Sequence, residues 1–516
     1  MSRARLARWA ALGALAGTVL AAALVGAGSG SSAGPAGPLP GPFDWPSYGH
    51  DPQHSFHGDT TLDRASAARL AQAWFFPTGD AVTATPTVVD GVVYVGSWDD
   101  YFYALDLRSG ALRWRYRLHP QPAVAPQPGQ VPRQVTSDGG MVTSSAWFEP
   151  AAGRRPPLVI FGGGYTLYAL DARTGRPYWT HAYTGRPDRP PDPQSDDTRI
   201  FSSPVVVDGK VLFGVSVDGA RGRRGYVVAA SVATGRPVWE YQTDADGSGR
   251  VLDDGCGSVW SSGTVLASAG LVVFDTSDCH FANPPPLSES VLALRIADGR
   301  LAWSFRPARV DQRCDYDFGA TPNAGLGPGG RARFLGVGGK DGTYYSLDPA
   351  TGSLRWATRV VFGGFSGGFI GTTAYDGRAV YGATALGDYG RFEHGQTLTC
   401  EPGNPADAPM QEPSVHAFDA RSGQVLWQAD QGASFGPTTV AGGLTVSGVA
   451  LRDEVDVRDA ATGSLVARLP TRAPCWSGVA TVGDALVLGT GASQQGHPDG
   501  VYAFTPGGRP PSVPGR

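Results

Sequence analysis

Lysine is almost absent from this 516-residue chain, which contains only Lys210 and Lys340. Basic and acidic residues are nearly balanced, 42 against 46, so the net charge of −4 offers no basic surface to nucleic acid or to an anionic membrane. Stretches with helical periodicity are also scarce, whereas glycine (73) and proline (42) are abundant. This composition favours many short strands joined by turns.

Cysteine is scarce as well, and its spacing excludes two common uses. The five cysteines are Cys256, Cys279, Cys314, Cys400 and Cys475. None is adjacent to another and no Cys-x-x-Cys pair occurs, which excludes a zinc knuckle and a c-type haem attachment site. In an exported protein five cysteines form disulfides and leave one thiol over.

The N-terminus carries the only long apolar run. Arg3, Arg5 and Arg8 precede apolar residues 9–25, and small residues follow. We interpret 1–28 as a signal peptide and 29–46 as a Gly/Ser/Pro-rich spacer, which predicts a secreted or extracytoplasmic protein with no stable membrane span after cleavage. An uncleaved membrane anchor is the alternative.

A short phrase recurs along the chain at fixed spacing. An acidic residue is followed four positions later by glycine and eight positions later by tryptophan, at Asp106/Gly110/Trp114, Asp171/Gly175/Trp179, Asp348/Gly352/Trp356 and Asp419/Gly423/Trp427. Gly235/Trp239 and Gly299/Trp303 lack the acid, and Asp459/Gly463 has Ala467 in the last position. Glycine supplies the positive φ of a tight turn, and alternating residues such as "TLYAL" precede it, so each copy predicts a β-hairpin followed by an aromatic anchor.

A second recurrent element precedes each hairpin. It begins with small or hydroxyl residues, as in "FSSPVVV" at 201–207 and "WSGVATV" at 476–482, and eight copies occur. Four strands per unit and eight units predict an all-β fold, an eight-bladed propeller of four-stranded antiparallel blades, with the small residues on the innermost strands. A series of β-sandwich domains is the less favoured alternative.

The last unit lacks an outermost strand. The segment "LAQAWFFPTG" at 70–79 supplies one, with Trp74 as its anchor, so we expect the N-terminal strand to close the ring. Seven of the 13 tryptophans then occupy equivalent docking positions. The propeller is predicted over 47–508, with a disordered tail over 509–516 and a short helix near 62–71.

Blade connectivity places all five cysteines and the long insertions on one face. Such a face is expected to present the functional site. Cys256 and Cys279 flank one strand pair there, so we expect them to form a disulfide, with Cys314 as a competing partner for Cys279.

The repeat resembles those of pyrroloquinoline-quinone (PQQ) dehydrogenases and of their non-catalytic relatives, such as the propeller of the outer-membrane assembly lipoprotein. The resemblance covers nearly all of 44–508. "DWPSYGHDPQHS" at 44–55, "LSESVLAL" at 287–294, "DYDFGATPN" at 315–323 and "GGKDGTYYSLD" at 338–348 are most similar to the polyvinyl alcohol dehydrogenases. The resemblance implies alcohol oxidation by hydride transfer to PQQ, held with Ca²⁺ over the channel.

The same resemblance implies ligand-binding residues. Trp260 matches the tryptophan on which the quinone stacks, and Lys340 matches a cation that bonds the quinone oxygens; a core tryptophan and a solvated turn lysine are the alternatives. "FDTSD" at 274–278 lies where the family has Gly-x-Gly-Asn, so Asp278 replaces a calcium-binding Asn. Asp218 is the only candidate for the calcium ligand of the third blade.

Three carboxylates are candidates for the base that takes the alcohol proton. Glu289 matches an acidic position of the polyvinyl alcohol enzymes and ranks equally with Asp317, and Asp315 is a third candidate. Each of them can instead cap a turn or form an ion pair.

Some features depart from the dehydrogenases. Gly139 and Gly140 stand where adjacent cysteines often cover the cofactor, and no haem segment is present, so an external electron acceptor is required. A non-catalytic propeller that binds a protein or a cell-wall polymer is therefore the alternative to an alcohol-oxidising enzyme.

Overall fold

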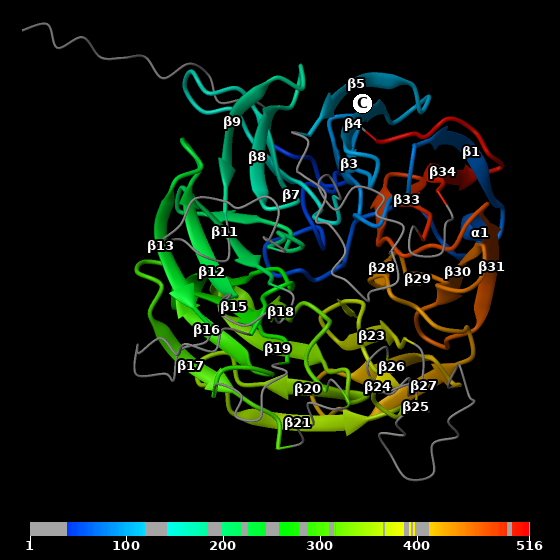
Figure 1. Ribbon diagram of the computed structural model, residues 1–516. Helices are drawn as coiled ribbons and strands as arrows, with labels where there is room; N and C mark the ends of the chain where they lie inside the picture. Colours follow the sequence, from blue (N-terminus) through cyan, green and yellow to red (C-terminus); the bar gives the residue numbers. More distant parts are fainter. Residues whose placement is uncertain are drawn as a thin grey trace, which may run out of the picture.

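The chain folds into a ring of sheets in the computed structural model. The residues it describes are 39–514 without 119–141, 184–197, 218–224, 244–256, 279–285, 309–313, 315, 365–366, 386–391, 394–395, 398–411 and 493–497. They form eight four-stranded sheets with antiparallel pairing, which surround a common centre in Figure 1. The predicted eight-bladed propeller is confirmed.

Blades one to seven follow the chain order, each from the innermost to the outermost strand. Blades one to three are β2 (Thr87–Val89), β3 (Val92–Gly96), β4 (Tyr101–Asp106) and β5 (Leu112–Arg117); β6 (Trp147–Glu149), β7 (Leu158–Gly163), β8 (Thr166–Asp171) and β9 (Pro177–Ala182); and β10 (Val205–Val207), β11 (Lys210–Val215), β12 (Tyr226–Ser231) and β13 (Pro237–Gln242). Blades four and five are β14 (Thr264–Leu266), β15 (Leu271–Asp275), β16 (Val291–Arg295) and β17 (Leu301–Phe305); and β18 (Asn323–Leu326), β19 (Ala332–Gly338), β20 (Thr343–Leu347) and β21 (Leu354–Arg359). Blades six and seven are β22 (Ala374–Tyr375), β23 (Ala379–Ala383), β26 (Val415–Asp419) and β27 (Val425–Ala429); and β28 (Thr439–Ala441), β29 (Leu444–Gly448), β30 (Glu454–Asp459) and β31 (Leu465–Pro470).

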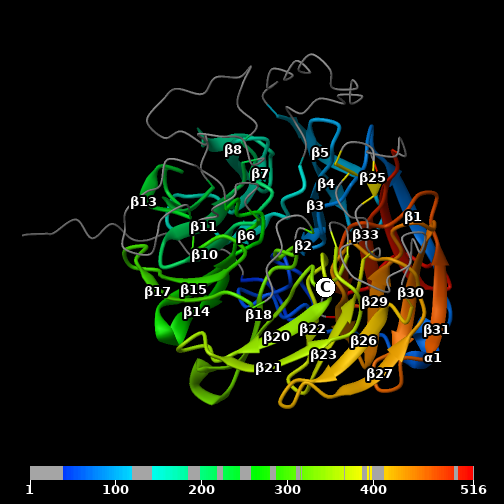
Figure 2. The same cartoon turned by 60° about the horizontal axis from the view of Figure 1, so that its bottom comes forward.

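Blade eight joins the two ends of the chain. It contains β32 (Val479–Val482), β33 (Ala485–Gly489), β34 (Gly500–Pro506) and, outermost, β1 (Leu70–Pro77). Blue β1 lies beside red β34 in both Figure 1 and Figure 2, and the two strands pair from Leu70 with Pro506 to Pro77 with Gly500. The ring therefore closes with the N-terminal strand, as predicted.

The remaining elements are short. They are the helix α1 (Arg64–Ala67), the 3₁₀ turns η1 (Ala267–Ala269) and η2 (Pro328–Gly330), and a ribbon of β24 (Phe392–Glu393) and β25 (Gln396–Thr397) between the second and third strands of blade six. The helix lies within the predicted range of 62–71, and Asp63 caps its N-terminus by accepting the Ser66 backbone N–H.

The recurrent tryptophan fixes each blade against the next one. Trp179, on the outermost strand of blade two, packs on the turn glycine Gly235 of blade three. A Cβ added to Gly235 would lie 2.4 Å from Trp179 Cε3. The equivalent pairs are Trp74–Gly110, Trp114–Gly175, Trp239–Gly299, Trp303–Gly352, Trp356–Gly423 and Trp427–Gly463. Trp179 Nε1 also donates to the Val232 carbonyl of the same turn at 2.8 Å. These tryptophans are structural anchors because all seven pack their faces on the next blade, and six of them, all but Trp303, also donate their N–H group to it.

A belt of hydroxyl groups links the blades around the channel. The belt consists of Thr85, Ser145, Ser203, Ser262, Thr321 and Thr372, each of which lies two residues before the innermost strand of its blade. Four adjacent pairs are bonded in the same way: the backbone N–H of one member donates to the hydroxyl of the next, at 2.9 Å from Ser145 to Ser203, from Ser203 to Ser262 and from Ser262 to Thr321, and at 3.1 Å from Thr321 to Thr372. Hydroxyl residues begin these strands because they satisfy the backbone of the preceding blade.

Residues 44–61 form a plug across the channel. Backbone carbonyls of the plug accept N–H groups from several innermost strands, including Val88 in blade one, Val265 in blade four and Val440 in blade seven. Trp45 and Phe56 are fully buried in it. The plug therefore pairs the inner edges of blades that are distant in sequence, which is the role of the "DWPSYGHDPQHS" segment.

The structure extends beyond both expected ends of the propeller. Trp45 pairs with Val88, so packed structure begins before residue 47. Residues 509–514, expected to be part of a disordered tail, include Ser512, whose N–H donates to Asp484 Oδ1 at 2.7 Å. These six residues pack on blade eight because the edge at Asp484 offers them a carboxylate and a backbone N–H.

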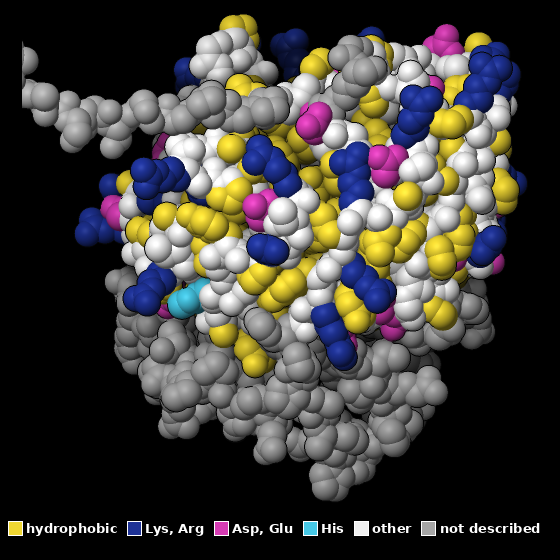
Figure 3. Space-filling view, turned by 90° about the horizontal axis from the view of Figure 1, so that it is seen from above, with side chains coloured by type: hydrophobic (Ala, Val, Ile, Leu, Met, Phe, Trp, Pro, Cys, Tyr) yellow, Lys and Arg dark blue, Asp and Glu magenta, His cyan; other side chains and the backbone are white. Residues whose placement is uncertain are grey.

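The outer surface carries no concentration of positive charge on the face seen in Figure 3, where Lys and Arg side chains are scattered among hydrophobic ones. In the described part of the chain, no helix has the length and apolar character needed to cross a membrane.

Two glycines of blade three provide a matched test of the tryptophan anchor. Gly209 and Gly235 both have positive φ, +71° and +68°, but only Gly235 contacts a tryptophan. We expect Gly209→Ala to cost about 1 kcal/mol of unfolding free energy, from backbone strain alone. Gly235→Ala should cost about 3 kcal/mol, since displacing Trp179 adds to the strain. Urea denaturation measures both values, and equal losses would show that the contact is not stabilising.

Candidate functional site

Eight equivalent residues line one mouth of the channel. Each lies two positions before the hydroxyl belt position, and all eight are partly exposed: Thr83, Thr143, Phe201, Trp260, Gly319, Ile370, Phe435 and Trp476. Trp260 of blade four and Trp476 of blade eight belong to opposite sides of the ring. The mouth is therefore largely apolar and aromatic, which suits a flat ligand. Sequence reasoning selected only Trp260, although the register of "WSGVATV" also identifies Trp476.

Lys340 and Asp317 form a buried ion pair beside Trp260. Lys340 Nζ lies 2.7 Å from Asp317 Oδ1, and the two side chains are only 4% and 1% exposed. The same ammonium lies 4.7 Å from the centroid of the Trp260 ring. Asp317 precedes β18 and Lys340 follows β19. These two strands of blade five are antiparallel neighbours, so the segment before one and the segment after the other lie at the same end of the blade. Lys340 is thus a buried member of the site and not a solvated turn residue.

Asp278 joins this pair from the neighbouring blade. It follows β15 in blade four, and its backbone N–H donates to Asp317 Oδ2 at 3.0 Å. The Lys340 N–H in turn donates to the Asp317 carbonyl at 2.9 Å. Asp317 is therefore held by three groups from two blades, which fixes the orientation of its carboxylate at the mouth.

Glu289 lies in the same site in a strained conformation. Its φ is +51°, which is unfavourable for a residue other than glycine, and its side chain is fully buried. Glu289 Oε2 pairs with Arg306 Nη2 at 2.6 Å. Burial raises the pKa of Glu289, the Arg306 guanidinium opposes this rise, and the charges of Asp317 and Asp278 add to it. Glu289 is thus within electrostatic range of both aspartates.

Asp275 is a fourth carboxylate, which sequence reasoning missed. It is the last residue of β15, it is completely buried, and among the described groups neither carboxylate oxygen has a hydrogen-bond partner. Burial raises the pKa of Asp275 well above its ordinary value; the nearby Ser261 hydroxyl lowers it, Asp317 raises it and Lys340 lowers it. The available signal was the Asp at the second position of "FDTSD", which aligns with the first glycine of the Gly-x-Gly-Asn motif that the resemblance implies.

Two other predicted site residues cannot be placed. Asp218 and Asp315 lie outside the described residues. Within the described chain, no group of three or more His, Cys, Asp or Glu side chains is placed to hold a metal ion. Of the two predicted calcium ligands, Asp278 is the one that the structure describes, and it lies beside Asp317.

The cysteine predictions are only partly accessible to test. Cys256, Cys279 and Cys400 lie outside the described residues, so the disulfide between Cys256 and Cys279 stays a prediction. Cys314 is buried at the entrance to blade five. Cys475 is a buried free thiol, and burial raises its pKa to about 12, so it is unreactive as a nucleophile.

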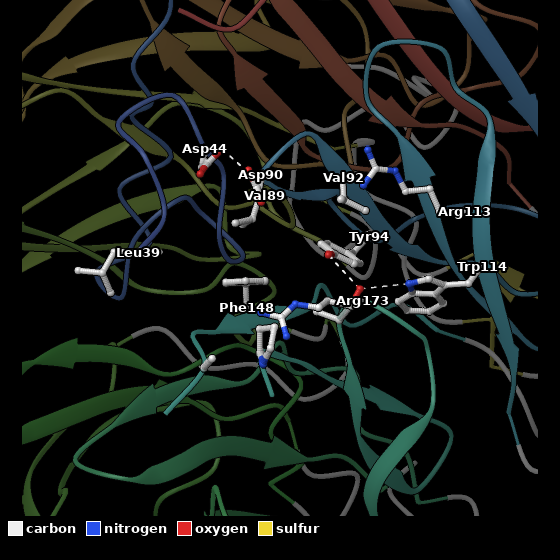
Figure 4. Close-up of a pocket in the computed structure, with 13 residues that line it drawn as sticks. Leu39, Asp44, Val89, Asp90, Val92, Tyr94, Arg113, Trp114, Phe148 and Arg173 are labelled. Atoms are coloured by element: carbon white, nitrogen blue, oxygen red, sulfur yellow. Dashed lines mark hydrogen bonds between the residues drawn. The ribbon is translucent and has the colours of Figure 1, made fainter. Parts of the chain in front are cut away.

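A pocket between blades one and two, also lined by Leu39 and Asp44 of the N-terminal segment, is a separate feature (Figure 4). Aromatic residues, including Tyr94, Trp114 and Phe148, line it. The Tyr94 hydroxyl and the Trp114 Nε1 both donate to the Ala172 carbonyl at 3.1 Å, so these aromatics join the two blades. No predicted site residue lies in this pocket, and we place the functional site at the channel mouth.

Removal of the Lys340 charge should show how much the buried ion pair contributes to the free energy of unfolding. We expect Lys340→Met to lower the free energy of unfolding by about 3–5 kcal/mol at neutral pH, because Asp317 loses its buried counter-charge. Lys210→Met, at the only other lysine of the chain, is the control and should change stability by less than about 0.5 kcal/mol. Denaturant titration measures both; similar values for the two variants would contradict a charge-balanced pair.

Comparison with known proteins gives consistent matches. A profile described as "Glucose/ethanol/alcohol dehydrogenase, beta-propeller domain" matches residues 45–359. The polyvinylalcohol dehydrogenase of Sphingopyxis sp. (strain 113P3) is 24% identical over 415 residues, 72% of this chain and 56% of that protein. The dehydrogenase subunit of the quinone alcohol dehydrogenase of Komagataeibacter europaeus is 25% identical over 449 residues, 78% of this chain and 56% of that protein.

Solved structures agree on the fold. The quinohemoprotein alcohol dehydrogenase of Comamonas testosteroni superimposes with a TM-score of 0.68 and 20% identity, covering 92% of this chain and 82% of that one. The chain spans only 56% of the length of the polyvinylalcohol dehydrogenase and quinone alcohol dehydrogenase it matches.

Proposed function

The chain belongs to the glucose/ethanol/alcohol dehydrogenase β-propeller family, and on this premise we propose that it is a PQQ-dependent dehydrogenase that oxidises alcohols. The observation that carries the proposal is the stack of Trp260, Lys340 and Asp317 at the channel mouth, which unites an aromatic face, a cation and a carboxylate. Hydroxyl groups of a polymer are included among the proposed substrates because the matched relatives include polyvinylalcohol dehydrogenases. A scaffold without catalysis is the less favoured alternative.

The channel mouth fits a planar quinone. Trp260 is partly exposed and offers its ring face, and Phe435 and Trp476, which contact each other edge to face, add apolar surface elsewhere around the mouth. When bound, PQQ supplies the two-electron acceptor for the hydride of the alcohol. Lys340 is placed to bond quinone oxygens, since its ammonium lies over the Trp260 ring and would stabilise negative charge there.

Calcium coordination is proposed on fewer residues. Asp278 would contribute a carboxylate oxygen from blade four, and Asp218 would contribute from blade three. Oxygen ligands of this kind are what Ca²⁺ prefers. The proposal is supported by the number of carboxylates near the mouth, where, among the described residues, Asp275, Asp278, Glu289 and Asp317 lie with the cations Lys340 and Arg306.

We assign the role of base to Asp317 and not to Glu289. Asp317 contacts both Lys340 and the Asp278 backbone, so its carboxylate is fixed next to the Trp260 face where a substrate would lie. Its carboxylate would take the proton from the hydroxyl oxygen while the hydride leaves the carbon atom that bears this hydroxyl group. Glu289 is bonded to Arg306 and shapes the side of the mouth. Asp315 remains a further candidate.

Electrons would then pass to an external acceptor. The relatives include the 1-butanol dehydrogenase (cytochrome c) of Thauera butanivorans, so a small redox protein is the class of acceptor we propose. Location outside the cytoplasm stays a prediction that rests on the N-terminal apolar run.

Ligand binding can be measured without turnover. With PQQ and Ca²⁺ at about 100 times the dissociation constant, we expect about 2.7 kcal/mol of added stability, which raises the melting temperature by a few degrees. Trp260→Ala should abolish the shift. Trp147→Ala, which truncates a partly buried tryptophan away from the mouth, should lower the melting temperature but keep the shift. No shift in the wild-type chain would reject the cofactor site.

Turnover distinguishes the two candidate bases. In a dye-reduction assay with PQQ, Ca²⁺ and a panel of alcohols, Asp317→Asn should lower kcat by roughly 10²–10⁴-fold, the usual contribution of a general base. Glu289→Gln keeps the side-chain volume and should have a much smaller effect. The reverse order would move the base to Glu289, and no dye reduction by the wild-type protein with any alcohol would reject the proposed activity.

A further inference from the structure

The cavity between blades one and two lies apart from the channel mouth. Asp90 and Arg173, which line it, belong to hairpin turns, and these turns are at the opposite end of each blade from the loops that carry Trp260 and Lys340. Its volume is about 220 Å³. Sites for drug-sized ligands have about 300–1,000 Å³, so this cavity suits a smaller molecule, about the size of a substituted benzene ring.

Aromatic side chains form fixed walls of this cavity. Tyr94 and Trp114 line it from blade one, and Phe148 lines it from blade two. The ring centroid of Tyr94 lies 6.0 Å from that of Trp114 and 6.3 Å from that of Phe148. The hydroxyl of Tyr94 and the Nε1 of Trp114 both donate to the Ala172 carbonyl at 3.1 Å. Because these bonds hold the rings, the apolar walls are formed before any ligand binds.

A small residue in blade one leaves the space open. Val92 pairs with Asp106 in β3 and β4, and the same register in blade five puts Phe334 in this position. Phe334 stacks on Tyr375 of blade six, with ring centroids 4.5 Å apart and an interplanar angle of 12°. Tyr375 is in turn the counterpart of Phe148 in its blade. Two stacked rings therefore fill this place between blades five and six, whereas Val92 leaves room for a ring beside Phe148.

One cation lines the cavity without a partner. Arg173 comes from the turn after β8, and Figure 4 shows its side chain beside the aromatic rings. Within the described part of the chain its guanidinium forms no ion pair, whereas Arg113 is paired with Asp106 at 2.7 Å. Asp44 and Asp90 also line the cavity and lie together in Figure 4, bonded at 3.3 Å. They repel an anion, so the negative group of a ligand is directed to Arg173.

We propose that this cavity binds a small aromatic carboxylate, with its ring against Tyr94 and Phe148 and its carboxylate on Arg173. Offset and edge-to-face contacts between rings favour an aromatic body over an aliphatic one of equal size. A guanidinium matches the two oxygens of a carboxylate with two parallel N–H donors. The site goes beyond the proposed function and does not depend on it, since no residue of the channel mouth takes part.

Direct binding tests the class of ligand. Phenylacetate, titrated into the full chain and followed by ligand-observed NMR, should bind saturably, and phenylacetamide, which has the same shape without the charge, should bind about ten-fold more weakly. Arg173→Gln should weaken phenylacetate binding about ten-fold and leave phenylacetamide unaffected. Arg176→Gln, at an exposed arginine of the same turn that does not line the cavity, should change neither. Equal binding of the two compounds, or no saturable binding of phenylacetate, overturns the proposal.

Filling the cavity tests the location of the site. Val92→Phe should place a ring against Phe148, abolish phenylacetate binding and leave the melting temperature unchanged or higher. Ala151→Phe, at a partly exposed loop residue that lines the cavity, should block binding as well, whereas Ala152→Phe, next to it and outside the cavity, should not. Trp260→Ala at the channel mouth should keep phenylacetate binding. Binding that survives both filling variants, or that Trp260→Ala removes, overturns this site and leaves the proposed function untouched.

Discussion

The packing of a tryptophan side chain on a turn glycine of the next blade sets the spacing between the blades of the propeller. Seven such contacts repeat from blade to blade, and each needs a backbone with positive φ and no side chain. Because the ring must close, a change in one contact alters the angles of all the others. The channel radius, and with it the distance between Trp260 and the residues of blade five, depends on these peripheral contacts.

The channel mouth combines buried charges, backbone strain and an unpaired polar group, all of which are unfavourable for stability. Among the described residues, the buried carboxylates Asp275, Glu289 and Asp317 lie with the cations Lys340 and Arg306, Glu289 has a strained backbone, and the Asp275 carboxylate has no hydrogen-bond partner. Such features reduce stability, and the surrounding blades compensate for them. The Lys340–Asp317 ion pair keeps both buried charges compensated. Either charge without its partner would lower the stability of the fold more than the intact pair does.

The fold could be predicted almost completely from the sequence. The fixed spacing of aspartate, glycine and tryptophan in each repeat locates the turn and the strands on either side of it. Seven tryptophans and their glycines, the eight innermost strands and the closing role of 70–79 all followed from spacing. The site was predicted less fully. Trp260, Lys340 and Asp317 were found, but their contacts depend on loop ends from two blades that no spacing rule relates. Asp275 was missed because a single carboxylate in a strand end carries no pattern, and its burial becomes visible only when blade five covers it.

The plug and the closing strand have a consequence for how the chain acquires its structure. Residues 44–61 are made early, yet they bond to strands of blades seven and eight, which are made last. Until β34 emerges, β1 has no partner, and the growing ring has two open edges. Contacts of such long sequence separation form slowly, and unpaired edges favour aggregation. The ring therefore reaches its final topology only after β34 has been made, and its open edges favour self-association until then.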